Sequence, residues 1–186
     1  MRIIGGELKR TVIPSPPGDA TRPTMDRIRE SIFDVLEGNL TLQTARVLDL
    51  YAGSGILSWE ALSRGAQSTI MVDSSVQICR HLRAVAMDLG VSERVQIVRT
   101  DCLAYLRNAT VDGIQLLFAD PPYALRHCNS ILGILEESPL LSDDALVVLE
   151  HGDQEYVVPT ERFRAVWHGS GGACVVDIFQ RVGPVA

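Results

Sequence analysis

Residues 46–55 read Arg-Val-Leu-Asp-Leu-Tyr-Ala-Gly-Ser-Gly, and this stretch decides the fold. Its first six residues are apolar except for one arginine and one aspartate, as expected of a strand that is covered on both faces. Gly53 and Gly55 allow a tight turn, and the helical pattern of residues 56–64 follows at once. A buried strand, a glycine turn and a helix predict the first unit of a parallel α/β sheet.

The same alternation of short apolar runs and helical patterns continues to residue 150. It predicts parallel strands that are joined by crossover helices. The strands are expected at residues 46–51, 68–73, 95–100, 114–120 and 145–150, and the helices near 56–64, 75–89, 102–108 and 127–137.

Beyond residue 150 the helical period fades, and residues 162–168 and 173–181 read as two further strands. Gly169-Ser170-Gly171-Gly172 supplies a turn between them, which predicts an antiparallel hairpin at one edge of the sheet. The fold class is therefore expected to be α/β, with a doubly wound, Rossmann-like, seven-stranded and mostly parallel sheet that ends in this hairpin. That layout differs from a plain dinucleotide-binding fold and is typical of class I S-adenosylmethionine-dependent methyltransferases.

The N-terminal region is expected to form an extension of the sheet domain. Residues 2–4 and 11–13 can pair as a small β-hairpin, and Thr24 has the residue type of an N-cap for the amphipathic helix that follows. We expect residues 1–40 to pack on a methyltransferase domain formed by residues 41–186.

The composition favours one soluble domain. With 186 residues, of which 46% are hydrophobic, the chain can bury one substantial core. No apolar run reaches the roughly 18 residues that span a bilayer, and the N-terminus lacks the apolar region of a signal peptide, so we expect a cytoplasmic protein. We also expect a monomer. The four cysteines and four histidines lack the spacing of ligands, and neither a metal nor a disulfide framework is predicted.

The glycine turn is the expected cofactor site, because ligands of open α/β sheets bind above the carboxyl ends of the strands. Asp73 ends the next strand and is placed to accept hydrogen bonds from ribose hydroxyls, and Asp101 after the third strand can take an adenine amino group. The expected cofactor-binding residues are Asp49, Tyr51, Gly53, Ser54, Gly55, Asp73, Asp101 and Cys102.

A Gly-x-Gly turn followed by an acidic residue also serves nicotinamide cofactors, but two features favour S-adenosyl-L-methionine. Ser58 occupies the position of the third glycine of a dinucleotide site. Asp49 would face the place where a dinucleotide carries its pyrophosphate, and a carboxylate attracts a methionine ammonium but repels a phosphate.

The residues Asp120-Pro121-Pro122-Tyr123 end the fourth predicted strand and form the candidate catalytic motif. An exocyclic amine on a base is a poor nucleophile because its lone pair is delocalised into the ring. Hydrogen bonds to the Asp120 carboxylate and the Pro121 carbonyl would direct that lone pair towards a methyl donor, while Tyr123 stacks on the ring. We therefore expect an enzyme that modifies an amino group.

Charge is distributed unevenly along the chain. The formal net charge is −6, yet residues 1–30 carry +2 and the remaining 156 residues carry −8. Contacts to nucleic acid phosphates are therefore expected near the N-terminus. The expected RNA-binding residues are Arg2, Lys9, Arg10, Arg22, Thr24, Arg27 and Arg29.

Together these motifs resemble one family. The motifs are residues 2–6 (Arg-Ile-Ile-Gly-Gly), residues 21–33 with Thr-Arg-Pro-Thr and Asp-Arg-x-Arg-Glu, residues 49–55, residues 60–66 and residues 120–123. This set resembles the RsmD family of 16S ribosomal RNA guanine-N2 methyltransferases. The resemblance implies methylation of the exocyclic amine of one guanine in 16S rRNA, which is presented within the small ribosomal subunit or its assembly intermediate.

Other functions stay open at this point. A DNA adenine-N6 methyltransferase uses the same Asp-Pro-Pro-Tyr chemistry, but 186 residues leave little room for a target-recognition region. A protein-glutamine methyltransferase typically has Asn at the position of Asp120. A nicotinamide oxidoreductase and a non-catalytic RNA-binding module are alternatives from other classes.

Overall fold

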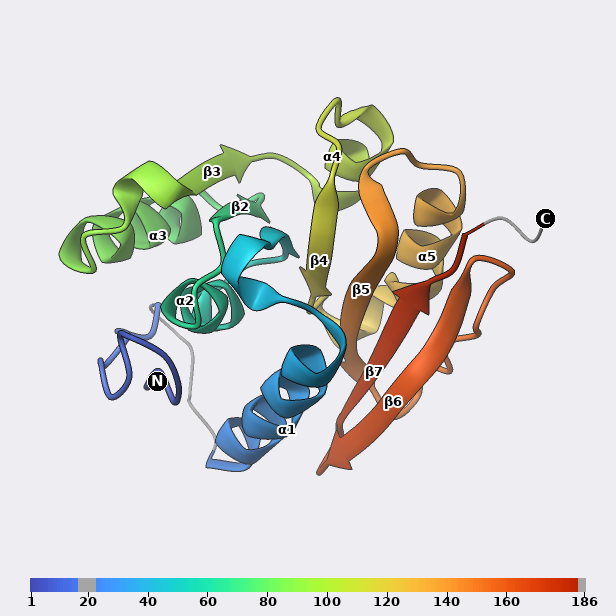
Figure 1. Ribbon diagram of the computed structural model, residues 1–186, viewed down its shortest axis with the longest axis horizontal. Coiled ribbons are helices and arrows are strands. Elements are labelled where there is room, and N and C mark those ends of the chain that lie inside the picture. The colour runs from blue at the N-terminus through green and yellow to red at the C-terminus, as the bar shows by residue number, and fades with distance from the viewer. Residues whose placement is uncertain (17–22, 184–186) are drawn as a thin grey trace.

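In the computed structural model, which describes residues 1–16 and 23–183, seven strands form one sheet in the order β3-β2-β1-β4-β5-β7-β6 (Figure 1). The strands are β1 (Arg46–Leu50), β2 (Ser68–Asp73), β3 (Val95–Arg99), β4 (Ile114–Ala119), β5 (Leu141–Gly152), β6 (Phe163–Gly171) and β7 (Cys174–Arg181). The helices are α1 (Pro23–Asn39), α2 (Ile56–Ser63), α3 (Val76–Asp88), α4 (Cys102–Asn108) and α5 (Cys128–Glu136), with short 3-10 turns η1 (Leu42–Thr44), η2 (Ser92–Arg94) and η3 (Tyr123–Leu125).

The predicted fold class is confirmed. Strands β1 to β5 pair in parallel, whereas β7 pairs antiparallel with both β5 and β6. β5 begins at Leu141, before the predicted start at Ala145, because a register irregularity against β4 admits a polar segment that contains Asp144 with a φ of 62°. Residues 142–144 are polar, so the apolar run that predicts the strand begins only at Ala145.

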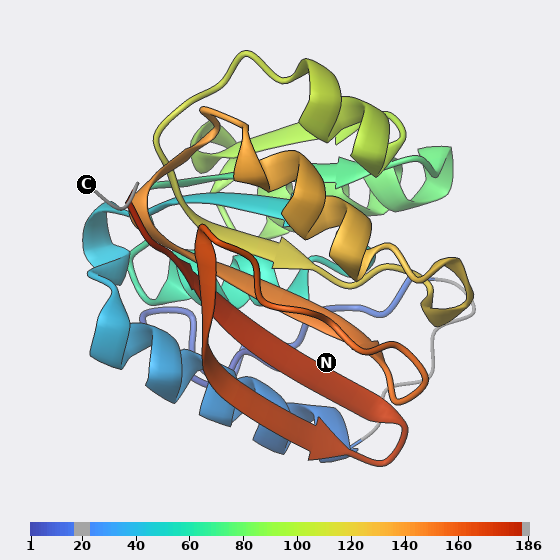
Figure 2. The same ribbon diagram turned by 90° about the vertical axis from the view of Figure 1, so that its right-hand side faces the viewer.

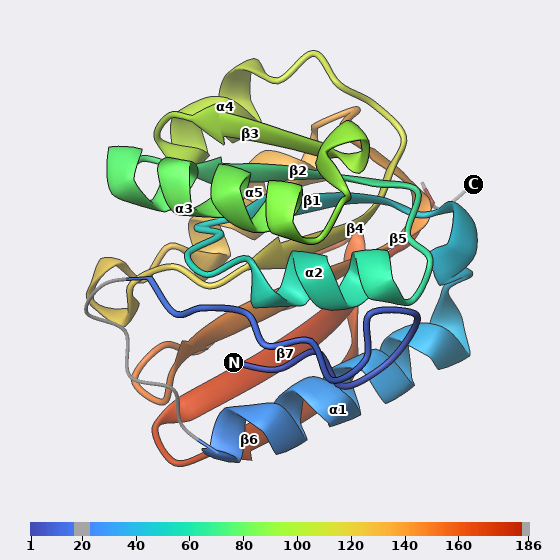
Figure 3. The ribbon, with the colours of Figure 1, turned by 90° about the vertical axis from the view of Figure 1, so that its left-hand side faces the viewer.

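Helices cover both faces of the sheet. α4 and α5 lie on one face of the sheet (Figure 2), and their apolar residues pack in one cluster with the central strands. α1, α2 and α3 lie on the opposite face, where Figure 3 views them. The indole of Trp59 on α2 is fully buried on this side. Among the described residues, no helix is long and apolar enough to cross a membrane.

Residues 1–13, here named the arm, lie along α2 and beside α1 (Figure 3). A β-bridge between Arg2 and Val12 confirms the predicted pairing, and Ile3 and Ile13 are buried. The prediction that Thr24 caps α1 is wrong, because the helix already begins at Pro23. Proline suits the first helical position, since its fixed φ is helical and its missing N–H needs no partner there.

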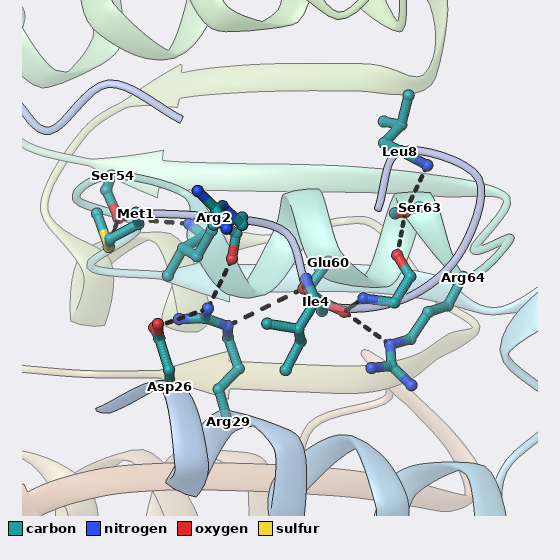
Figure 4. Close-up of polar contacts among 12 residues, drawn as sticks. Met1, Arg2, Ile4, Leu8, Asp26, Arg29, Ser54, Glu60, Ser63 and Arg64 are labelled. Carbon is teal, nitrogen blue, oxygen red and sulfur yellow. Dashed lines mark hydrogen bonds and ion pairs between the residues drawn. The ribbon is translucent and has the colours of Figure 1, made fainter. Parts of the chain in front are cut away.

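A buried carboxylate joins the arm to both helices (Figure 4). The side chain of Glu60 on α2 is fully buried and accepts hydrogen bonds from the backbone N–H groups of Ile4 (2.8 Å) and Gly5 (2.7 Å). It also accepts from Arg64 Nε at 2.9 Å, and Arg29 Nε of α1 lies 4.0 Å away. Two cations and two peptide donors therefore compensate the desolvation of one carboxylate.

Replacement of Glu60 should destabilise the protein strongly. Glu60→Ala removes the acceptor of two partly buried peptide N–H groups and of Arg64 Nε, and the carboxylate that faces the buried Arg29. We expect the free energy of unfolding to fall by about 3–5 kcal/mol. Urea denaturation measures the change. Glu37→Ala is the control, because Glu37 also pairs with Arg64 but its side chain is 50% exposed, so about 1 kcal/mol or less should be lost. Equal losses in the two variants would show that Glu60 is not the junction.

Candidate active site

The two candidate motifs meet at the carboxyl edge of the sheet. β1 and β4 are adjacent and parallel, and their last paired residues are Leu50 and Ala119. Tyr51 directly follows the end of β1, and Asp120 directly follows the end of β4. Neighbouring strands lie about 4.8 Å apart. The glycine loop and the Asp-Pro-Pro-Tyr motif therefore start side by side.

The glycine loop, residues 51–55, has the backbone conformation that its two glycines predict. Gly53 and Gly55 have φ values of 52° and 73°, which side-chain-bearing residues rarely adopt. A Cβ atom on Gly55 would lie 2.7 Å from Trp59 Nε1, and that nitrogen donates a hydrogen bond to Ser54 O at 2.9 Å. The backbone N–H of Gly53 donates to Asp73 Oδ2 at 3.2 Å, so the loop and the end of β2 are directly joined.

Asp49 lies beneath the loop, where it is 4% exposed and accepts a hydrogen bond from Ser58 Oγ at 2.7 Å. Burial raises the pKa of this carboxyl from 3.8 to about 7; the Ser58 hydrogen bond opposes the shift and the charge of Asp73 adds to it. A nearby cation would favour the ionised form. The acidic residues Asp49 and Asp73 therefore suit a ligand that offers an ammonium group and hydroxyl donors.

The backbone of Tyr51 contacts the side chain of Cys102. The N–H of Tyr51 donates to Cys102 Sγ at 3.2 Å, and the Tyr51 hydroxyl is 2.7 Å from His127 Nδ1. Burial raises the pKa of the Cys102 thiol to about 12, which makes it a packing group and not a nucleophile. Asp101 is exposed and caps α4 by accepting a hydrogen bond from Ala104 N at 2.8 Å.

The Asp-Pro-Pro-Tyr motif has one buried and three exposed residues. Pro121 is buried, while Asp120 and Pro122 are exposed and Tyr123 is 39% exposed. The Tyr123 hydroxyl donates to Glu150 Oε1 at 3.0 Å. Burial and the charge of Glu150 raise the pKa of Tyr123 above its usual range, so this tyrosine stays protonated.

Sequence reasoning missed two residues that fix Tyr123. Glu150 is 9% exposed and also accepts a hydrogen bond from Cys174 Sγ at 3.2 Å. A Cβ atom on Gly152 would lie 3.1 Å from the Tyr123 ring, so the glycine lets the ring lie against β5. A glutamate that ends the apolar run of residues 145–149 is the sequence signal that could have identified the first of them.

A cavity of about 340 Å³ opens beside the Tyr123 ring. The loop after β4, the loop after β5 and the turn between β6 and β7 line it. The cavity therefore provides room for a planar group next to the acceptor motif.

The expected RNA-binding residues occupy different environments. Arg2, Lys9, Arg10 and Arg27 are exposed. Arg29 is 3% exposed and donates to Arg2 O (2.8 Å) and Asp26 Oδ1 (3.0 Å), as Figure 4 shows, so its position contradicts the expected phosphate contact. Its sequence position on a basic stretch could not reveal that it faces α2. Arg22 and the side chain of Thr24 lie outside the described residues.

Known proteins match the chain over most of its length. The family model described as conserved hypothetical protein 95 matches residues 1–180. YlbH, a candidate rRNA methyltransferase of Bacillus subtilis (strain 168), is 34% identical over 161 residues, which cover 86% of this chain and 86% of that protein. Ribosomal RNA small subunit methyltransferase D of Escherichia coli (strain K12) is 30% identical over 160 residues, which cover 86% of this chain and 78% of that protein.

Solved structures share the fold. That of yhhF, a candidate methyltransferase from Escherichia coli, has a TM-score of 0.85 at 27% identity and covers 98% of both chains. An RNA methyltransferase from Salinibacter ruber, solved with S-adenosyl-L-homocysteine, has a TM-score of 0.63 at 16% identity and covers 90% of this chain and 97% of that one. The family model spans almost the whole chain, and relatives at 30% identity or more match most of it. The chain therefore belongs to the RsmD family of ribosomal RNA methyltransferases.

Proposed function

We propose that this protein transfers a methyl group from S-adenosyl-L-methionine to the exocyclic N2 amine of a guanine in 16S rRNA. The observation that carries the proposal is the parallel register of β1 and β4, which starts the glycine loop and the Asp-Pro-Pro-Tyr motif at neighbouring positions. Membership of the RsmD family and the name of the Escherichia coli relative support ribosomal RNA as the substrate.

The residues around the glycine loop suit the cofactor. Asp49 would face the methionine ammonium, Asp73 the ribose hydroxyls and Asp101 the adenine amino group. Gly53 supports close approach of a ligand, because a Cβ atom added there would meet only Tyr51 O, at 3.7 Å. When bound, the cofactor supplies a sulfonium methyl group that is reactive enough for direct transfer.

At the acceptor side, the protein orients the amine. The Asp120 carboxylate and the Pro121 carbonyl accept hydrogen bonds from its two N–H groups, which directs the nitrogen lone pair towards the glycine loop. As the S–CH3 bond breaks and the N–CH3 bond forms, the nitrogen gives up one of these two protons. Tyr123 supports the base from the position set by Glu150 and Gly152. These roles require neither a metal ion nor a covalent intermediate.

RNA engagement is assigned to the N-terminal extension, residues 1–40. The exposed cations Arg2, Lys9 and Arg10 are carried by the arm, whose backbone is fixed on α2 through Glu60. Attachment of the arm to α2 favours phosphate binding, because the backbone that carries these cations is ordered before RNA arrives. A base in structured RNA must leave its stack to reach Asp120, at a cost of a few kcal/mol that such contacts offset.

Labelled methyl transfer tests the function. Wild-type protein and tritiated S-adenosyl-L-methionine should label small ribosomal subunits or their 16S rRNA, and mass spectrometry should locate the label at N2 of one guanine. Asp120→Ala should slow transfer by about 100-fold or more while calorimetry finds unchanged cofactor affinity, because only the acceptor amine loses its orientation. Label in DNA adenine, or at another atom of RNA, would refute the assignment.

Cofactor affinity should depend on pH through Asp49. The methionine ammonium favours the ionised carboxylate, whereas the carboxyl of the free protein is protonated below its pKa of about 7. Binding below that pH must release a proton, so affinity should fall about tenfold for each further pH unit and level off above about pH 7. Calorimetry from pH 5.5 to 7.5 checks this. Asp49→Asn should bind more weakly at pH 7.5 and lack the slope; a slope that persists in this variant would assign it to another group.

The arm cations should set the salt dependence of RNA binding. The double substitution Lys9→Ala/Arg10→Ala should weaken binding of the RNA substrate and reduce the slope of log affinity against log salt by about 1 for each phosphate that the variant no longer neutralises. Arg107→Ala is the matched control, because Arg107 is an exposed cation on α4, on the other face of the sheet. Equal effects of the two changes would mean that the arm has no special role.

A further inference from the structure

The loop after β5, here residues 153–158, presents an aromatic side chain to solvent. Tyr156 is 82% exposed, the highest value among the large hydrophobic side chains that are exposed in the described chain. Single exposed apolar residues are normal on protein surfaces. Tyr156 differs from an ordinary exposed apolar residue because hydrogen bonds fix the backbone around it.

Three hydrogen bonds hold the loop to the start of α5. The side chain of Asn129 donates to Tyr156 O at 2.9 Å and accepts from Val158 N at 3.0 Å. Glu155 Oε1 accepts from Cys128 N at 3.0 Å. These bonds fix Glu155, the carbonyl of Tyr156 and the N–H of Val158. The Tyr156 ring can therefore contact a partner without the entropy cost of ordering the loop.

The loop borders the cavity beside the acceptor motif. Gly152 and Glu155 line that cavity together with Tyr123, and Tyr156 follows Glu155 directly. Figures 2 and 3 agree that the loop after β5 lies beside the loop between β4 and α5. Whatever enters the cavity therefore passes close to the loop that carries Tyr156.

The charged residues that line the cavity determine which part of an RNA can bind at its rim. Asp153 and Glu155 line the cavity against one cation, Arg126. The rim of the cavity is therefore net negative and repels phosphates, whereas the exposed cations of the arm attract them. The face of an unpaired base carries no charge, and stacking on an aromatic ring needs none.

We propose that Tyr156 is a stacking platform for an unpaired base of the RNA substrate that flanks the base held by Asp120. The inference rests on the proposed RNA methyl transfer and adds a second contact surface to it. The arm then binds the phosphate backbone, and Tyr156 holds a neighbouring base in its unstacked position.

A substitution series at Tyr156 tests the platform on small ribosomal subunits. Tyr156→Ala should raise the KM for the RNA substrate by about 5- to 150-fold, with kcat and cofactor affinity unchanged. Tyr156→Phe should keep the wild-type KM, because it retains the ring. Tyr156→Leu should behave like the alanine variant, because leucine is apolar but cannot stack. Met87→Ala is the matched control, since Met87 on α3 is 74% exposed and should have no effect.

The KM values of the alanine and leucine variants decide whether Tyr156 stacks on a base. An unchanged KM in the alanine variant overturns the platform while methylation continues, which distinguishes it from failure of the proposed function, where wild-type protein would not label RNA. A leucine variant with wild-type KM would identify an apolar contact with a protein of the particle and would also overturn base stacking. Thermal denaturation of all variants should be unchanged, because the side chain is exposed.

Discussion

The parallel pairing of β1 with β4 is the constraint on which the whole site depends. Residues 46–50 and 114–119 are far apart in sequence, yet their backbone hydrogen bonds fix the ends of the two strands in register. Parallel strands require crossover connections, so both loops emerge at the same edge of the sheet. The glycine loop and the Asp-Pro-Pro-Tyr motif are therefore neighbours before any ligand binds. Catalysis by orientation needs such a fixed relation.

Burial of acidic groups is the second theme of the structure. Asp49, Glu60 and Glu150 are all at least nine-tenths buried, and each has a different compensation. Glu60 is surrounded by peptide donors and guanidinium groups, whereas Glu150 accepts from a neutral hydroxyl and a neutral thiol. Asp49 has one hydroxyl donor and a raised pKa. The carboxylate of Glu60 joins segments of the fold, and that of Asp49 suits a cationic ligand.

This surface presents two chemically different regions. The arm offers exposed cations at one side of the cofactor loop, and the rim of the cavity beside Tyr123 is acidic. Phosphates suit the first and base faces suit the second. On the proposed function, this division also explains how a chain with a net charge of −6 can act on a polyanion: residues 1–30 carry +2, and the remaining 156 residues carry −8.

The sequence alone determined the element order, the glycine turn and the acceptor motif, because these depend on local periodicity and on residue types that tolerate few conformations. It also predicted the bridge between residues 2–4 and 11–13. Only the tertiary structure decided that Arg29 faces the interior and that Glu150 fixes Tyr123, because both contacts join residues more than twenty positions apart. The start of β5 likewise depends on its pairing with β4. Local pattern specifies what each segment can form, whereas long-range packing selects which side chains are buried, which remain exposed and which of them meet.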